Sequence, residues 1–306
     1  MEKIKLWKLY SGVLKKHTEE DAENLIISGT PRTTPNIEDI PPELPKPWLF
    51  ARVLLLSLAA FAGFYIGMLY FENMNFLPGL IMFGSVVTPI SLLVFFWEIN
   101  IVQNISVYKL TLFFVKGSVV SLLCTVILYA VLDGELSPIL VGFIEETAKV
   151  LTIIILMGRK NYKYMLNGML IGAAVGTGFA VFESAAYILM TAKYGIPTML
   201  NTIFWRAVFA PGGHIAWASL TGTALIWVKG DRPLHISLLF DKRFLGMYIL
   251  VVLMHTMWDT EIPHPLVLGV PVLPVSLTII SWVILFAVIK RGFRQVINIA
   301  QDTQTE

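Results

Sequence analysis

Charged residues are scarce in this chain, since Asp, Glu, Lys and Arg make up only 14% of its 306 residues. Soluble globular domains carry about 25% of these residues. The apolar fraction is correspondingly high, at 56%, and the mean hydropathy is +0.71. This balance excludes an ordinary soluble domain and predicts an integral membrane protein.

Cysteine is nearly absent as well. The one cysteine, Cys124, lies in an apolar run and excludes an internal disulfide framework and a zinc site built from cysteines. The net charge of +2 comes with no basic face or nucleic-acid motif, so we expect no nucleic-acid partner. The first apolar run begins near residue 49, and the sequence therefore predicts no cleavable signal peptide.

Long apolar runs are what the chain has in quantity. A helix needs about 17–25 mostly apolar residues to cross the hydrocarbon core of a lipid bilayer. The sequence therefore predicts an all-α, polytopic membrane protein with about eight transmembrane helices. The predicted spans are 49–71, 76–98, 110–132, 137–157, 166–190, 198–228, 244–260 and 266–289. The sixth is interrupted by the sequence PGG, and the seventh is short.

Lys and Arg fall almost entirely on one side of these spans. Eighteen of them lie in the N-terminal segment, in the loops on the same side and after the last span, whereas the opposite loops contain only Lys193. Cytoplasmic loops of membrane proteins are enriched in these residues. The asymmetry predicts that both termini lie in the cytoplasm.

Three parts are expected along the chain: a cytoplasmic leader over 1–48, a helical membrane domain over 49–290 and a cytoplasmic tail over 291–306. The leader begins with KIKLWKLYSGVLKKH, which has apolar residues on one side and lysines elsewhere. This pattern suits a helix on an anionic membrane surface, and a short solvated helix is the alternative. The rest of the leader is rich in proline and predicts a linker without a core of its own.

Several ionisable side chains lie inside the predicted spans, away from the cytoplasmic ends. They are Glu145, Glu146, Lys149, Glu183, Arg206 and Asp259, with His214 and His255 nearby. Each charge costs roughly 2.5–3.5 kcal/mol at the centre of a membrane helix. Six such costs exceed the whole stability of a typical domain, about 5–15 kcal/mol. We therefore expect these side chains to gather around an intramembrane polar cavity.

Depth places this cluster in the outer half of the membrane. At a rise of about 1.5 Å per residue, Glu145 lies about 12 Å below the outer face and Glu183 about 10 Å short of it. His255 and Asp259 are shallower. His214 would lie too deep on a straight helix, and a helix break at PGG is needed to raise it.

Spacing along each helix pairs some of these side chains. Glu145 and Lys149 are four residues apart and are predicted to pair on one face, with Glu146 pointing about 100° away. Asp259 follows His255 by four residues, so its carboxylate can orient the imidazole. Small residues at 172–178 allow a neighbouring helix to approach closely. A purely structural ion pair is the alternative interpretation of any one of these patterns.

Four motifs carry a resemblance to a known family. They are EETAK at 145–149, FAVFESAAY at 179–187, RAVFAPGGH at 206–214 and HTMWD at 255–259. In this order they resemble the PrsW family of intramembrane proteases, within the superfamily that includes the CAAX prenyl endopeptidases. The resemblance covers a core at about 137–260. It adds Phe179, Tyr187 and Arg206 to the expected site as supporting residues.

The resemblance implies an intramembrane endopeptidase in the inner membrane of a bacterium. PrsW-like enzymes cut a membrane-anchored anti-sigma factor on its extracytoplasmic side, which is site-1 proteolysis and begins the release of a sigma factor. A membrane-anchored protein substrate is therefore the expected partner.

Peptide hydrolysis requires an activated water, a stabilised oxyanion and a proton donor for the leaving amine. Our hypothesis assigns Glu145 as the general base on water, with Lys149 tuning it and Glu146 holding the polar network.

The two histidines complete this hypothesis. His255, oriented by Asp259, and His214 would stabilise the oxyanion and pass on protons. Glu183 would position water or one of the imidazoles. No cofactor is favoured, because the chain has no His-Glu-x-x-His and its two candidate histidines lie on different spans.

Two alternatives stay open. A zinc-dependent protease would use His214, His255 and either Glu183 or Glu146 as ligands. A non-catalytic polytopic scaffold would use the same polar residues to bind partner helices.

Overall fold

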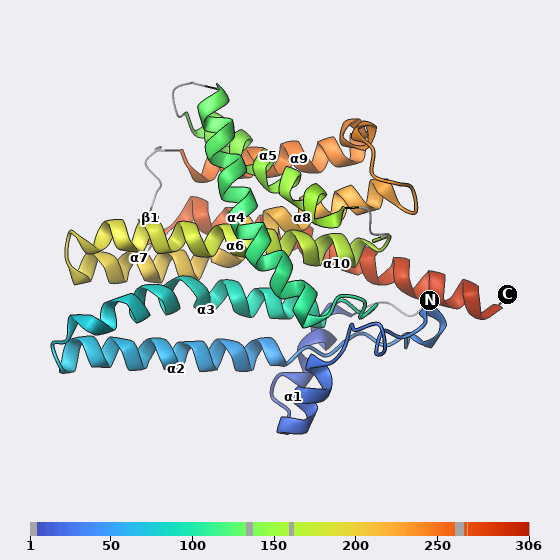
Figure 1. Ribbon diagram of the computed structural model, residues 1–306, viewed down its shortest axis with the longest axis horizontal. Helices are drawn as coiled ribbons and strands as arrows, with labels where there is room; N and C mark the ends of the chain where they lie inside the picture. The colour runs from blue at the N-terminus through green and yellow to red at the C-terminus, as the bar shows by residue number, and fades with distance from the viewer. Residues whose placement is uncertain (1–4, 133–136, 159–161, 261–265, 268, 306) are drawn as a thin grey trace.

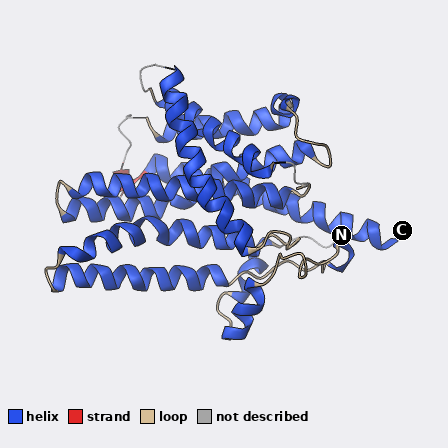
Figure 2. Ribbon diagram, viewed as in Figure 1, coloured by secondary structure: helices blue, strands red, loops and turns tan. Residues whose placement is uncertain are grey.

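A computed structural model describes residues 5–132, 137–158, 162–260, 266–267 and 269–305 (Figure 1). The α-helices over these residues are α1 (Glu19–Ile26), α2 (Leu49–Tyr70), α3 (Leu77–Glu98), α4 (Val107–Leu132), α5 (Pro138–Met157), α6 (Met165–Ala192), α7 (Ile196–Phe209), α8 (His214–Lys229), α9 (Lys242–Trp258) and α10 (Val272–Thr305). Short 3-10 helices are η1 (Leu6–Gly12), η2 (Ile37–Asp39), η3 (Met74–Phe76), η4 (Ala210–Gly212) and η5 (Ile236–Phe240). The helical fold class is confirmed for the described residues (Figure 2).

Helices α2 to α6 begin and end within three residues of the first five predicted spans. By length and composition, five helical segments of the described chain can cross a membrane: Leu49–Tyr70, Met74–Glu98, Val107–Leu132, Met165–Ala192 and Val272–Gln304. Helix α5 is also 20 residues long but contains three charged side chains, and α7, α8 and α9 have 14, 16 and 17 residues. The chain is therefore a multi-pass membrane protein, and the number of eight crossings stays a prediction.

Two predicted spans differ from the helices. The sixth, 198–228, consists of α7 and α8 separated by η4, so the break expected at PGG is present. The eighth begins later than predicted, because β1 (Leu266–Val267) and β2 (Val270–Pro271) pair antiparallel before α10 starts. Gly269, with a φ of 78°, allows the tight turn between them. Helix α10 then continues to Thr305, through most of the predicted tail.

Helix α6 lies at the centre of the bundle and is buried along 94% of its apolar window. It packs most closely against α8 through glycines. A Cβ at Gly168, Gly172 or Gly176 would collide with the carbonyl oxygen of Gly222, Ala218 or His214, respectively. The predicted close approach at the small residues is thus confirmed, and Gly176 brings the start of α8 directly against α6.

The leader packs against the membrane domain. Among the described residues of the predicted surface helix, Leu6–Gly12 is helical, and Leu9 on its apolar side is fully buried in the main core. Ile40, in the proline-rich part, is also buried there. Gln304 near the end of α10 donates to the carbonyl oxygen of Glu38 at 2.6 Å. The leader thus shares the core of the bundle, and its contacts join it to the end of the chain.

Glu98 has a structural use that the sequence did not indicate. Its carboxylate accepts hydrogen bonds from the backbone N–H groups of Trp48, Leu49 and Phe50 at 2.8–2.9 Å. These are donors that a helix start leaves without partners. The end of α3 therefore caps the start of α2, and the two helices run side by side at one edge of the bundle (Figure 1).

Candidate active site

The predicted polar residues come together from five helices. Helix α5 supplies Glu145, Glu146 and Lys149, α6 supplies Glu183, α7 supplies Arg206, α8 begins at His214, and α9 carries His255 with Asp259 directly after its end. The break at η4 is what allows Arg206 and His214 to reach the same place. All of these side chains contact at least one other member of the group.

Lys149 is fully buried and lies between both glutamates of its helix. Its Nζ is 2.6 Å from Oε1 of Glu146 and 3.9 Å from Oε2 of Glu145. The closer partner is therefore Glu146, three residues away, whereas the sequence predicted Glu145. Both i,i+3 and i,i+4 neighbours share a helix face, so spacing could not decide between them.

His255 is held by three carboxylates. Its Nδ1 lies 2.7 Å from Oε1 of Glu146, and its Nε2 lies 3.2 Å from Oδ2 of Asp259 and 3.6 Å from Oε2 of Glu145. The predicted contact with Asp259 is present. Glu146 of α5 adds a second contact that orients His255 of α9. The same oxygen, Oε1, contacts both His255 and Lys149.

His214 bridges the two halves of the cluster. Its Nδ1 lies 2.7 Å from Nζ of Lys149, and its Nε2 lies 3.0 Å from Oε2 of Glu183. An ammonium group can only donate, so Nδ1 accepts and the ring proton lies on Nε2, which donates to Glu183. The ring centroids of His214 and His255 are 5.1 Å apart.

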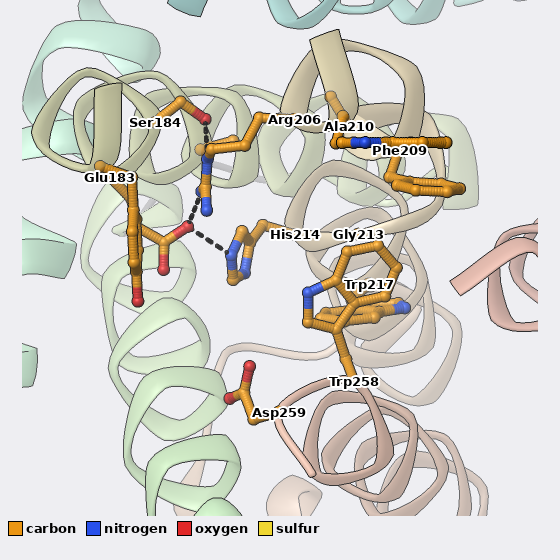
Figure 3. Close-up of a pocket in the computed structure, with 13 residues that line it drawn as sticks. Glu183, Ser184, Arg206, Phe209, Ala210, Gly213, His214, Trp217, Trp258 and Asp259 are labelled. Carbon is orange, nitrogen blue, oxygen red and sulfur yellow. Dashed lines mark hydrogen bonds and ion pairs between the residues drawn. The ribbon is translucent and has the colours of Figure 1, made fainter. Parts of the chain in front are cut away.

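Glu183 and Arg206 form the outer wall of the site (Figure 3). The guanidinium donates from Nη2 to Glu183 and from Nε to Oγ of Ser184 at 2.8 Å. Its Cζ lies 4.6 Å from the ring centroid of Tyr187, a cation–π contact. The predicted supporting roles of Arg206 and Tyr187 thus correspond to direct contacts. Phe179 lies beneath Lys149, whose Nζ is 4.4 Å from the ring centroid.

A cavity of about 270 Å³ opens beside these groups. Glu183, Arg206, His214 and Asp259 form its polar side, and Figure 3 shows Glu183 on α6 and Asp259 just after the end of α9 facing His214. Trp205, Phe209, Trp217 and Trp258 contribute aromatic rings to the lining, and Tyr187 lies against Arg206. A water molecule and a peptide segment can therefore meet the polar groups beside an apolar wall.

Glu145, His214 and His255 form a set that fits a metal ion. One ligand atom from each lies within 4.8 Å of the other two, and two imidazoles with a carboxylate are a catalytic zinc set. Oε2 of Glu145 is buried without a hydrogen-bond partner, as an atom facing a ligand would be. The carboxylate is Glu145, whereas the sequence named Glu183 or Glu146. Glu183 instead contacts Nε2 of His214, and Glu146 contacts Nδ1 of His255.

Sequence reasoning missed several residues around the site. Ser184 follows Glu183 in the chain and Trp217 lies one turn after His214, but neither carries a charge that draws attention in an apolar run. Ser281 lies on α10, outside the four motifs. Only the packing of the helices identifies them.

Comparison with protein families decides what this arrangement belongs to. The model of the PrsW family, described as intramembrane metalloproteases, matches residues 110–289, which is more than half of the chain. This chain belongs to the PrsW family. The match extends beyond the four motifs to most of α4 and about half of α10. No curated protein and no solved structure matches the chain.

Membership makes the chain an intramembrane peptidase. A membrane protein is then the implied substrate. The family's description as metalloproteases and the set Glu145, His214 and His255 point to the same part of the site.

Proposed function

We propose that this PrsW-family protease hydrolyses a peptide bond of a membrane-anchored protein near the extracytoplasmic face. The observation that carries the proposal is that Glu145, Glu183, His214 and His255 converge, and that Glu183 and His214 also line the cavity. These groups can activate water, bind an oxyanion and transfer protons. The carbonyl of the scissile bond would lie between the polar and aromatic sides of the cavity.

Glu145, His214 and His255 would hold a divalent metal ion once Lys149 releases Nδ1 of His214, because the ammonium occupies the lone pair that the metal would need. Zinc suits this donor set best. When bound, the ion would supply Lewis-acid polarisation of the carbonyl and a more acidic water. Glu183 and Glu146 would fix the orientation of the two imidazoles, since Glu183 contacts Nε2 of His214 and Glu146 contacts Nδ1 of His255. Asp259 would help to orient His255.

Lys149 favours a second route without a metal. Its ammonium lies within 2.7 Å of His214 Nδ1 and 2.6 Å of Glu146 Oε1, so it already balances negative charge in the cluster. On this route Glu145 acts as the general base on water. Lys149 and the imidazoles stabilise the oxyanion, and His255 returns a proton to the leaving amine.

The side of cleavage follows from the orientation of the chain. The excess of Lys and Arg supports a cytoplasmic location of both termini, in a bacterial inner membrane. The start of α2 and the end of α10 lie at the same end of the bundle (Figure 1). His255 is three residues from the opposite end of α9. The cluster would therefore act in the outer half of the bilayer, as site-1 cleavage of an anti-sigma factor requires.

The decisive test compares the native protein with Glu145→Gln in the presence of a co-expressed membrane-anchored substrate that carries an extracytoplasmic reporter. We expect the native protein to release the reporter and the variant to lose this activity, while its amount and membrane insertion are unchanged. A matched loss of folded protein in the variant would instead support the scaffold interpretation. Candidate substrates, anti-sigma factors among them, can be found by comparing membrane proteomes with the native and variant genes.

A further inference from the structure

The helix break that carries His214 is held in place from α10. Ser281 Oγ donates to the carbonyl oxygen of Gly212 at 3.0 Å, and Trp282 Nε1 donates to that of Pro211 at 3.0 Å. These carbonyls belong to η4, immediately before His214. A helix end leaves its last carbonyl groups without partners, so the two bonds satisfy polar groups that the break exposes.

Ser281 also holds an aromatic ring of the site. Trp217 Nε1 donates to Ser281 Oγ at 3.1 Å, while both residues are at most 1% exposed. The Trp217 ring centroid lies 4.9 Å from that of His255 and 5.6 Å from that of His214. One hydroxyl therefore links the break before His214 to the ring that packs against both imidazoles.

The contact between α10 and the break leaves no spare room. A Cβ at Gly212 would collide with Oγ1 and Cα of Thr278, one turn before Ser281. The break therefore packs closely against α10, and the hydroxyl of Ser281 fixes the position of Gly212 relative to Trp217. Among the described side chains, Ser281 is the hydrogen-bond partner of both the Gly212 carbonyl oxygen and the Trp217 indole N–H.

We infer that Ser281 is a positioning residue for the reaction, acting on His214 through Gly212 and on both imidazoles through Trp217. This inference rests on the proposed function of the site. Ser281 is fully buried and is not among the residues that line the cavity, so its hydroxyl acts by fixing geometry. A small misplacement of a catalytic group costs about a hundredfold in rate. Loss of the hydroxyl should therefore lower kcat and leave KM nearly unchanged.

The test uses Ser281→Ala in the full-length protein, with Ser219→Ala as the matched control. Ser219 is also a fully buried serine, but its hydroxyl donates to Ile215 within its own helix. We expect Ser281→Ala to lower kcat at least about tenfold with KM within about twofold. Ser219→Ala should change neither. Equal kcat values for the two variants would overturn the inference.

A double-mutant cycle isolates the hydroxyl's connection to Trp217. Trp217→Phe keeps a ring in place but removes the indole donor. Because both changes break the same bond, Trp217→Phe should lower kcat much less in the Ser281→Ala background than in the native protein. Additive effects of the two substitutions would contradict the proposed connection.

Spectra give a readout that does not depend on activity. In ¹⁵N-labelled protein, the indole resonance of Trp217 and the ring resonances of His214 should shift in Ser281→Ala and stay in place in Ser219→Ala. Unshifted resonances in Ser281→Ala would refute the positioning role. An inactive native protein with these shifts present would refute the proposed function while supporting the role of Ser281 in holding His214.

Discussion

Lys149 Nζ lies 2.7 Å from Nδ1 of His214, although the two residues are on different helices and 65 positions apart. The contact fixes the tautomer of the imidazole, because an ammonium leaves Nδ1 only the role of acceptor. The Nε2 proton is then directed at Glu183, which Arg206 holds from the other side. A continuous chain of polar contacts thus runs from α5 to the wall of the cavity.

Lys149→Met should destabilise the protein and abolish cleavage. The substitution leaves the fully buried Glu146 and the partly buried His214 without their shared partner, and removing one member of a buried ion pair costs about 3–5 kcal/mol. Lys116→Met is the control, since Lys116 is an exposed lysine on α4. Thermal unfolding in nanodiscs and reporter cleavage measure the two effects. A Lys149→Met protein as stable and active as the control would contradict the central role of this ammonium.

Arg206→Lys should reduce cleavage about tenfold although the charge is kept. Arg206 reaches Glu183 and Ser184 with two different nitrogens and lies over Tyr187, and an ammonium cannot reproduce this planar geometry. The change would free Glu183 to draw His214 from its position. Arg232→Lys is the control, because Arg232 also makes two hydrogen bonds but at the far end of α8. Similar rates for both variants would count against the outer wall as part of the machinery.

A strong chelator should remove activity, and zinc should restore it, if the three-residue set holds the ion. Metal content measured on the purified protein should reach about one ion per chain and fall in Glu145→Gln, His214→Ala and His255→Ala. In Glu183→Gln the affinity should fall less, by about 10–100-fold, because Glu183 only orients an imidazole. Full activity in the chelated, metal-free protein would establish the route in which Glu145 is the general base.

Gly176→Ala should lower both stability and activity. The added methyl group would collide with the carbonyl oxygen of His214, and overpacking of this kind costs about 1–3 kcal/mol. The collision also moves the residue that contacts Lys149 and Glu183. Gly63→Ala is the matched control, since a Cβ at this helical glycine of α2 meets nothing within 4 Å. Thermal unfolding and cleavage should distinguish the two, and equal behaviour would argue against the close α6–α8 contact.

Glu98→Gln should destabilise the protein without changing kcat. The neutral amide has one acceptor oxygen, whereas the carboxylate uses both of its oxygens to accept the three N–H groups at the start of α2. Loss of hydrogen bonds to a charged acceptor costs about 1.5–3 kcal/mol. Chemical or thermal unfolding would record this loss. A fall in kcat at full stability would show that α2 and the site are coupled.

The sequence by itself determined the class of the protein and most of its helices. Runs of apolar residues long enough to cross a bilayer have few alternative structures, because backbone polar groups in lipid must be satisfied within the helix. Hence α2 to α6 appear close to their predicted positions. The cost of burying Glu145, Lys149 and Glu183 singly also pointed to one polar cluster, and the break at PGG was visible as residues that weaken a helix.

Only the tertiary structure decided which side chains meet. Lys149 has both Glu145 and Glu146 within reach on its helix. Its closer partner is Glu146, whose Oε1 also contacts His255 of another helix. Helix periodicity gives the direction of a side chain within its own helix but not the rotation or depth of its neighbours. For the same reason, spacing could not show that Glu145 is the carboxylate grouped with both imidazoles. Nor could it show the burial of Leu9 and Ile40 in the core, or the contact of Ser281 with the break before His214. Those contacts join distant segments, and packing alone brings them together.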